Sequence, residues 1–225
     1  MKRPPQPIAK KHYLSNKYED FNLWIDYWYQ KKFLIETKPN KILEIGKGTG
    51  TLEMILERDG YNFTTLDIDK DLSPDVVGDV TKLPFKDNSY DTSCAFEVLE
   101  HIPFEEFSIA LKELRRVSKK YVVISLPYAT IFFSFAFQLF YMKSFSKIFR
   151  FLGLKPFEPS YINFSIPLFF LDKKGMIKAH AWEIGRKNLS IFKIRKVIRE
   201  QGFLIVKESG RIFYPYHRFF VLKKL

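Results

Sequence analysis

The chain has 225 residues, 46% of them hydrophobic, which is enough to bury the core of one domain of ordinary size. Its formal net charge of +12 favours an anionic partner: a nucleic acid, a phospholipid surface or a phosphorylated substrate. One cysteine, Cys94, excludes an internal disulfide framework and a cysteine-based zinc site, so we expect a cytoplasmic setting and no bound metal. The N-terminus lacks the apolar core of a secretory signal, and no apolar run reaches the ~18 residues of a membrane span.

Strands and helices alternate along the first half of the chain. Apolar spacing predicts a helix over residues 20–35, and a buried strand over 42–45 precedes a glycine-rich loop. A helix that stops at Gly60 and a second strand, "YNFTTLDID", follow. The next link is too short for a regular crossover helix of about a dozen residues. We therefore expect the helix between the second and third strands to be missing or reduced to a turn.

The pattern continues to the C-terminus, with one interruption. The predicted elements are a strand "YDTSCAFEV", a helix over 104–118, a strand "YVVISLP", a helix near 190–201, and strands "FLIVKES" and "RFFVLKK". This alternation predicts an α/β fold with a mostly parallel sheet. In such folds a ligand binds at the carboxyl ends of the strands, close to the first glycine loop.

The glycine loop lies in "KILEIGKGTG", where Gly46, Gly48 and Gly50 are spaced two residues apart after Glu44. A dinucleotide fingerprint needs its third glycine one residue later, where this chain has Thr51, and no Walker pattern is present. Glycines allow positive φ and a close approach of main chain to ligand. An acid at the strand end is unfavourable beside a pyrophosphate but suits an ammonium group. The loop therefore favours S-adenosylmethionine (SAM), which has a cationic amino-acid end and no phosphate.

Four blocks between residues 38 and 127 resemble, in order, those of the class I SAM-dependent methyltransferases, in particular the ubiquinone and menaquinone methyltransferase-like (type 11) group. They are the glycine loop, an acid about 20 residues later, "GDVTKLPFKDNSYD" and "FEVLEHIP". The resemblance implies a Rossmann-like fold with a seven-stranded, mostly parallel sheet and an antiparallel last strand. It also implies a cofactor site made of Glu44, Gly46, Gly48, Gly50, Asp67, Asp79, Val80 and Phe96.

Individual roles in that site can be stated as expectations. Asp67, at the end of the second strand, is placed to accept hydrogen bonds from the ribose hydroxyls, with Asp69 as its competitor. By resemblance, Asp79 reads the adenine amino group. A turn-capping role is the alternative for both Asp67 and Asp79. Lys47, between the first two glycines, is expected to point to solvent.

The residues after the fourth strand are candidates for catalysis. Glu97 and His101 lie near the expected point of methyl transfer, and either is a candidate general base. A structural role at a helix start is the alternative for Glu97 and Glu100, and capping is the alternative for His101. Methyl transfer from SAM mainly requires alignment, so a base is needed only when the acceptor must lose a proton.

Residues 128–172 interrupt the pattern with an aromatic insertion. Residues 131–142 are almost wholly apolar, and 143–152 would form a basic amphipathic helix beside a preceding apolar one. We expect either a substrate lid or a contact with an anionic membrane, and both suit a lipid-like or other small-molecule acceptor. RNA is the second choice of acceptor, because of the basic charge. The chain divides into an N-terminal arm and helix, a SAM-binding core, the insertion and a C-terminal part: 1–37, 38–127, 128–180 and 181–225.

Overall fold

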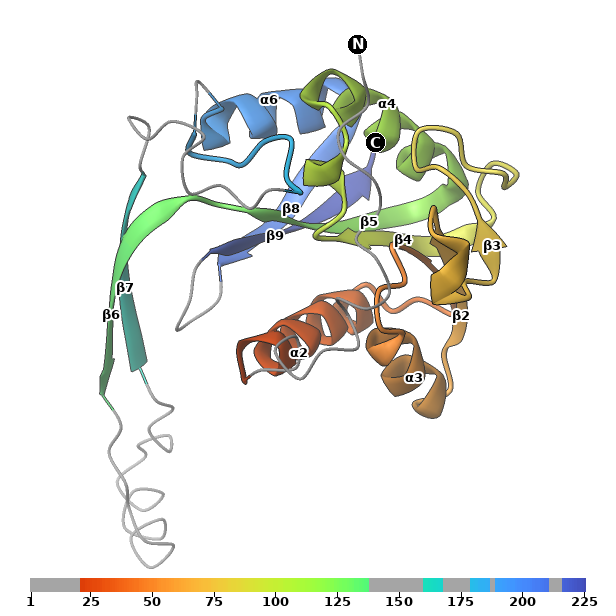
Figure 1. Ribbon diagram of the computed structural model, residues 1–225, viewed down its shortest axis with the longest axis horizontal. Helices are drawn as coiled ribbons and strands as arrows, with labels where there is room; N and C mark the ends of the chain where they lie inside the picture. The colour runs from red at the N-terminus through yellow and green to blue at the C-terminus, as the bar shows by residue number, and fades with distance from the viewer. Residues whose placement is uncertain (1–20, 138–159, 168–178, 187–188, 211–215) are drawn as a thin grey trace, which may run out of the picture.

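The computed structural model describes residues 21–137, 160–167, 179–186, 189–210 and 216–225. Its centre is a seven-stranded sheet with the order β3-β2-β1-β4-β5-β9-β8 (Figure 1). Strands β3, β2, β1, β4 and β5 are parallel, whereas β9 is antiparallel to both β5 and β8. The strands are β1 (Lys41–Ile45), β2 (Asn62–Asp67), β3 (Val76–Val77), β4 (Tyr90–Phe96), β5 (Ser118–Pro127), β8 (Phe203–Gly210) and β9 (His217–Lys224). The predicted α/β sheet with its antiparallel last strand is confirmed.

Helices cover both faces of this sheet. Helices α4 (Phe104–Val117) and α6 (Ile191–Glu200) lie on one face, and α2 (Phe21–Glu36) and α3 (Thr51–Arg58) lie on the other (Figure 1). Neighbouring residues of β1 therefore point into different cores. Leu43 packs in the core below α4 and α6, and Ile42 packs in the core below α2 and α3. Burial on both faces explains why β1 reads as a continuous apolar run.

The connection between β2 and β3 contains only a short 3-10 helix, η1 (Lys70–Leu72). The Asp69 side chain caps it by accepting a hydrogen bond from the Asp71 N–H at 2.9 Å. The prediction that the usual crossover helix is reduced to a turn is confirmed.

The insertion begins with a hairpin of two antiparallel strands, β6 (Thr130–Phe137) and β7 (Ser160–Pro167). These strands form a separate sheet that extends away from the main one (Figure 1). The apolar helix expected over 131–142 is therefore wrong for 131–137, because the aromatic and β-branched residues of this run favour a paired strand. Residues 138–142 and the basic helix expected over 143–152 lie outside the described residues. Among the described helices, none has the length and apolar character needed to cross a membrane.

Candidate active site

The glycine loop joins β1 to α3 at the carboxyl edge of the sheet. Gly46 donates a hydrogen bond from its N–H to the Leu66 carbonyl at 2.7 Å, which ties the loop to the end of β2. Gly46, Gly48 and Gly50 all have positive φ, at 84°, 55° and 74°. A Cβ atom at Gly46 would lie 2.3 Å from Cγ2 of Val98, which follows β4. The loop path therefore requires glycine at position 46 for both its backbone angle and its packing.

Glu44 lies immediately before this loop and is 5% exposed. Its Oε2 atom has no hydrogen-bond donor among the described residues. Burial raises the pKa of Glu44 well above its usual range, the nearby Glu53 raises it further, and Lys47 opposes both. A buried carboxylate oxygen without a donor fits a cationic ligand group, such as the ammonium of a bound amino acid.

Lys47 does not point to solvent, and this expectation is wrong. Its side chain is 17% exposed, and its Nζ atom lies 2.7 Å from Oε2 of Glu53 in the first turn of α3. The pairing is favoured because the loop folds back over the start of the helix that follows it. Lys47 therefore partly balances the negative charge of Glu44 and Glu53.

Asp67 ends β2 on the other side of the loop and is 9% exposed. It accepts a hydrogen bond from the Asp69 N–H at 2.9 Å. Burial raises the pKa of Asp67 overall, although hydrogen bonds from the backbone of Asp69, Gly48 and Lys47 oppose the rise. Asp67 therefore lies against the glycine loop, whereas the competitor Asp69 is committed to capping η1.

The remaining expected cofactor residues lie around this edge. Asp79 accepts hydrogen bonds from the N–H and the hydroxyl of Thr81 at 2.8 and 2.7 Å, the turn geometry named above as its alternative role. Val80 is buried in the core below α4. Phe96, the last residue of β4, is buried on the opposite face, where its ring centroid lies 6.3 Å from that of Phe219. A role for these three residues at the cofactor remains a prediction.

Helix α2 reaches this edge, which sequence reasoning did not anticipate. The Tyr27 hydroxyl lies 2.8 Å from Oγ1 of Thr49 inside the glycine loop. On the same helix, Asp26 is 4% exposed and its Oδ2 lies 2.9 Å from Nδ1 of His217. Asp26 shares the apolar face of α2 with Tyr29 and Phe33. A charged residue on a face that the sequence predicts to be buried was the signal that could have identified Asp26 as a site residue.

A cluster of acids, histidines and a tyrosine gathers beside the glycine loop, after the end of β4. We call it the acid–histidine cluster, and its members are Asp26, Glu97, Glu100, His101, His180, Glu183, Tyr216 and His217. They come from α2, the residues after β4, the segment after the hairpin and the start of β9. The structure therefore places His180 and His217 close to Glu97 and His101. The sequence alone could not decide whether these two histidines reach the site.

Glu97 follows β4 directly and has a left-handed backbone, with φ of 54°. Its N–H donates to Oγ of Ser125 at 3.1 Å, and its Oε2 lies 3.1 Å from Nε2 of His217. With Asp26 on the other ring nitrogen, His217 joins two carboxylates. Strained backbone of this kind at a strand end is typical of functional sites.

Glu100 and His101 belong to the 3-10 helix η2 (Leu99–His101). Glu100 is fully buried, and neither carboxylate oxygen has a hydrogen-bond donor among the described residues. Burial raises the pKa of Glu100, and the neighbouring Glu97 carboxylate raises it further. His101 Nδ1 lies 3.0 Å from the Ala179 carbonyl, and burial lowers the pKa of its imidazole. Both side chains therefore favour their neutral forms.

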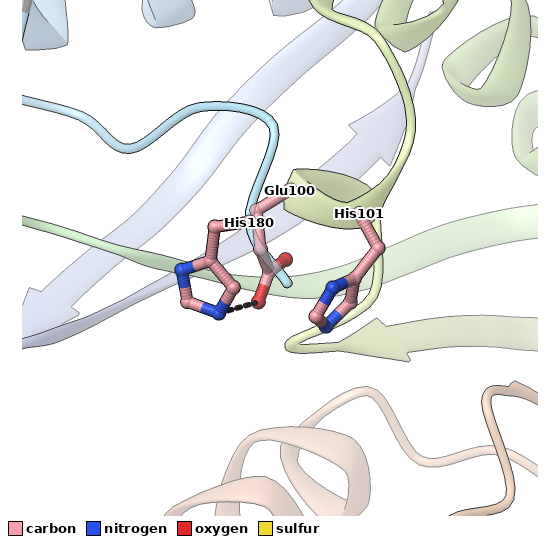
Figure 2. Close-up of side chains that lie close together, drawn as sticks. All are labelled: Glu100, His101 and His180. Carbon is pink, nitrogen blue, oxygen red and sulfur yellow. Dashed lines mark ion pairs between the residues drawn. The ribbon is translucent and has the colours of Figure 1, made fainter. Parts of the chain in front are cut away.

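His180 approaches from the segment after the hairpin, opposite Glu100 (Figure 2). Its Nε2 lies 3.9 Å from Oε1 of Glu100, and its Nδ1 lies 3.0 Å from Oε1 of Glu183. Glu183 also accepts hydrogen bonds from Arg186 at 2.7 Å and from the Tyr216 hydroxyl at 3.0 Å. Burial alone would raise the pKa of Glu183, but these donors outweigh it and hold the pKa low.

Comparisons with known proteins give a domain match and a common fold. A type 11 family model, described as a methyltransferase domain, matches residues 43–125. Magnesium protoporphyrin IX methyltransferase from Synechocystis PCC 6803, solved with bound SAH, is 16% identical with a TM-score of 0.56, over 96% of this chain and 92% of that one. A protein from Pyrococcus horikoshii OT3 is 15% identical with a TM-score of 0.59, over 97% of this chain and 100% of that one.

A SAM-dependent methyltransferase from Aquifex aeolicus is 13% identical with a TM-score of 0.59, over 97% of this chain and 100% of that one. A comparison with curated proteins gave no match. The resemblance found in the sequence is confirmed by the matched domain, and the fold is confirmed by the solved structures. Residues 43–125 match the model of a methyltransferase domain, and the chain has the fold of SAM-dependent methyltransferases.

Proposed function

We propose that this enzyme transfers a methyl group from SAM to a small-molecule or lipid-like acceptor. The observation that carries the proposal is Glu44, a buried carboxylate with a donor-free oxygen at the foot of a glycine loop. Asp67 lies against the other side of that loop. Together they match the two ends of a ligand that has a cationic amino-acid group and a ribose.

The residues around the loop have distinct roles in this proposal. Glu44 holds the amino group of the methionine part, and Gly46, Gly48 and Gly50 bring main chain against that part. Asp67 accepts hydrogen bonds from the ribose hydroxyls. Asp79 binds the adenine end of the cofactor, and Val80 and Phe96 contact the same end. When bound, SAM supplies an electrophilic methyl group on a sulfonium, so the chain mainly aligns the acceptor with it.

Glu97 is the candidate proton acceptor for a hydroxyl or similar acceptor group. It follows β4 directly, and His217, held by Asp26, lies 3.1 Å behind its carboxylate. A carboxylate oriented in this way by a second and a third group is the arrangement expected of a positioned base. His101 lies on the same side and is the second candidate.

The outer face of α2 supports a lipid-like acceptor. Phe21, Trp24 and Trp28 are spaced three and four residues apart, so they share one face of the helix, and they are 73%, 52% and 54% exposed. Lys32 places its Nζ atom 4.7 Å from the Trp28 ring centroid. Tryptophan beside lysine is typical of segments that lie in an anionic membrane interface. Because α2 also supplies Asp26 to the acid–histidine cluster, a membrane contact here would bring the site to lipid.

Calorimetry with S-adenosylhomocysteine (SAH) tests the cofactor proposal. We expect wild type to bind SAH, and Asp67→Ala to bind at least tenfold more weakly, because it removes hydrogen bonds to a charged group worth about 1.5–3 kcal/mol. Asp71→Ala, which changes an exposed acid on the same connection, is the matched control and should bind like wild type. Absence of heat with the wild-type protein would overturn the proposal.

Flotation with anionic liposomes tests the membrane contact through α2. We expect wild type to float with the vesicles, and the double variant Trp24→Ser, Trp28→Ser to remain in the dense fraction, because each tryptophan loses about 2 kcal/mol of apolar burial. Phe192→Ser is the matched control, since Phe192 is 71% exposed on α6, on the other face of the sheet. Equal flotation of all three proteins would contradict the proposal.

RNA remains the second candidate acceptor, supported by the net charge of +12. Several basic side chains are already engaged with acids, among them Arg116 with Glu113 and Arg195 with Glu208. Binding to RNA would weaken steeply with rising salt, because counterions are released from neutralised phosphates. Labelled methyl transfer to lipid and RNA fractions, measured separately, distinguishes the two acceptors.

A further inference from the structure

We propose that Glu100, His101 and His180 bind a divalent transition-metal ion, with Zn²⁺ as the first candidate. This departs from the expectation of no bound metal. Each of the three residues offers one potential ligand atom, and these atoms lie within 4.8 Å of one another (Figure 2). Glu100 is fully buried and His180 is 9% exposed, whereas His101 is half-buried. The placement of the ion beside the acceptor rests on the proposed function, but its binding does not.

Hydrogen bonds already orient both imidazole rings. Nδ1 of His180 lies 3.0 Å from a Glu183 carboxylate oxygen, and Nδ1 of His101 lies 3.0 Å from the Ala179 carbonyl. Because the Glu183 oxygen accepts a hydrogen bond, a neutral His180 ring carries its hydrogen on Nδ1 and keeps a lone pair on Nε2. The His101 ring is held in addition by a second backbone hydrogen bond, to Glu97. A histidine whose second nitrogen donates to a carboxylate or a carbonyl is the usual arrangement at protein metal sites.

Glu100 supplies the independent indication of a ligand. Both of its oxygens are buried without a hydrogen-bond donor among the described residues, and Nε2 of His180 faces one of them at 3.9 Å. An unpaired buried carboxylate costs several kcal/mol unless a cation or a proton neutralises it. A metal ion, a proton shared with Glu97 or an ion pair with His180 would each meet this requirement. The two oriented histidines favour the metal ion, since a shared proton needs neither of them and an ion pair needs only His180.

The donor set indicates the class of ion. Two imidazoles and one carboxylate are a common set for Zn²⁺ and for neighbouring divalent metals, and three protein ligands leave a fourth position for water or an acceptor oxygen. Ligand atoms about 2.1 Å from a tetrahedral ion lie about 3.4 Å apart, so the side chains would close by about an ångström on binding. His101 would then be a ligand, and Glu97 would remain the proton acceptor.

Metal titration of the full chain, purified without a polyhistidine tag and stripped with a chelator, tests the proposal. We expect wild type to bind Zn²⁺ with a stoichiometry of one by calorimetry and to develop visible Co²⁺ absorption bands. Glu100→Gln and His180→Gln should bind Zn²⁺ at least tenfold more weakly, and Glu183→Gln, which frees Nδ1 of His180, about 10–100-fold more weakly. His217→Gln removes a histidine that is not a ligand, so it should bind Zn²⁺ like wild type.

SAH binding, measured on the same proteins, separates the two proposals. Retained SAH affinity in Glu100→Gln together with lost Zn²⁺ binding would support the metal site. Wild type that binds SAH but neither Zn²⁺ nor Co²⁺ would overturn the metal site and leave the methyltransferase proposal standing. If Glu100→Gln loses SAH binding as well, that variant is misfolded and does not test the metal site. The Zn²⁺ affinity of His180→Gln and the wild-type Co²⁺ spectrum then test it. Equal Zn²⁺ affinity in His180→Gln and wild type, or no Co²⁺ bands, would refute the site.

Discussion

At the scale of one residue, the buried acid Glu44 carries a cost in stability that a role in ligand binding would explain. Its carboxylate is buried, its Oε2 lacks a donor among the described residues, and burial raises its pKa. When folding raises the pKa of an acid, the folded protein loses stability as the pH rises. The loss begins near the pKa in the unfolded chain, about 4.5, and continues until the pH passes the pKa in the folded protein. At neutral pH, and without a bound cation, the protein is therefore less stable than a variant with a neutral side chain at this position.

The substitution Glu44→Gln tests this balance, because it keeps the shape of the side chain and removes its charge. We expect a Tm higher than that of wild type by about 2–5 °C near pH 8, with the difference disappearing toward pH 4. Affinity for SAH should fall at least tenfold, because the charged partner of the ammonium group is lost. Thermal melts across this pH range measure the first effect, and calorimetry measures the second. A lower Tm with unchanged SAH affinity would contradict both.

At the scale of the element, the turn from β1 to α3 depends on a glycine for two separable reasons. Gly46 has φ of 84°, and a Cβ atom there would lie 2.3 Å from Val98. Gly60, which follows α3, has φ of 89° but no atom within 4 Å of the corresponding Cβ position. Alanine at Gly60 therefore meets backbone strain alone, whereas alanine at Gly46 meets the same strain and a steric clash.

Urea denaturation of Gly46→Ala and Gly60→Ala measures the difference. We expect Gly60→Ala to lower the free energy of unfolding by about 1–2 kcal/mol, the cost of a left-handed backbone with a side chain. Gly46→Ala should lose a further 1–3 kcal/mol from overpacking, about the cost of inserting one methyl group into a packed site. Equal losses in the two variants would show that the loop yields to the added methyl group.

The same elements show what a sequence can predict. The positions of the glycine loop after the first strand and of Asp67 at the end of the second could be predicted, because residues 44–67 form one strand–helix–strand unit with local spacing. The aromatic run 131–137 was misassigned, because a continuous apolar run has no period that separates a strand from a helix. Lys47 was misassigned because its partner Glu53 depends on how the loop turns, which glycine spacing alone does not fix.

At the scale of the whole molecule, the acid–histidine cluster could not be predicted from local patterns. Asp26 and His217 are 191 positions apart in the sequence, and only the seven-stranded sheet brings α2 and β9 together at one edge. Resemblance supplied the type of sheet, and the α/β alternation supplied the edge at which a ligand binds, but neither supplied the side-chain pairs across that edge. Glu183 was missed although His180 and Arg186 lie only three positions away, because only the fold brings Tyr216 to the same carboxylate and the group to the cluster.

The far edge of the sheet depends on one acid that joins three elements, and this makes stability depend on pH. Glu208 of β8 lies 2.7 Å from Nε of Arg195 in α6 and 2.7 Å from Nε of Arg218 in β9. Burial alone would raise the pKa of Glu208, but the two arginines outweigh it and hold the pKa below its ordinary value of 4.5. The stabilisation is therefore present above about pH 4.5 and is lost as the pH falls through the folded pKa.

Glu208→Gln removes this charge from the contact that joins β8, α6 and β9. At neutral pH we expect a loss of about 1–3 kcal/mol in the free energy of unfolding, because two guanidinium groups lose their charged acceptor. Glu105→Gln, at an exposed position in the first turn of α4, is the matched control and should change stability by less than about 0.5 kcal/mol. Thermal melts between about pH 3 and pH 8 should show the wild-type advantage over Glu208→Gln shrinking in acid, as protonation removes the same charge. An advantage that is constant across this range would assign the loss to packing and not to the ion pairs.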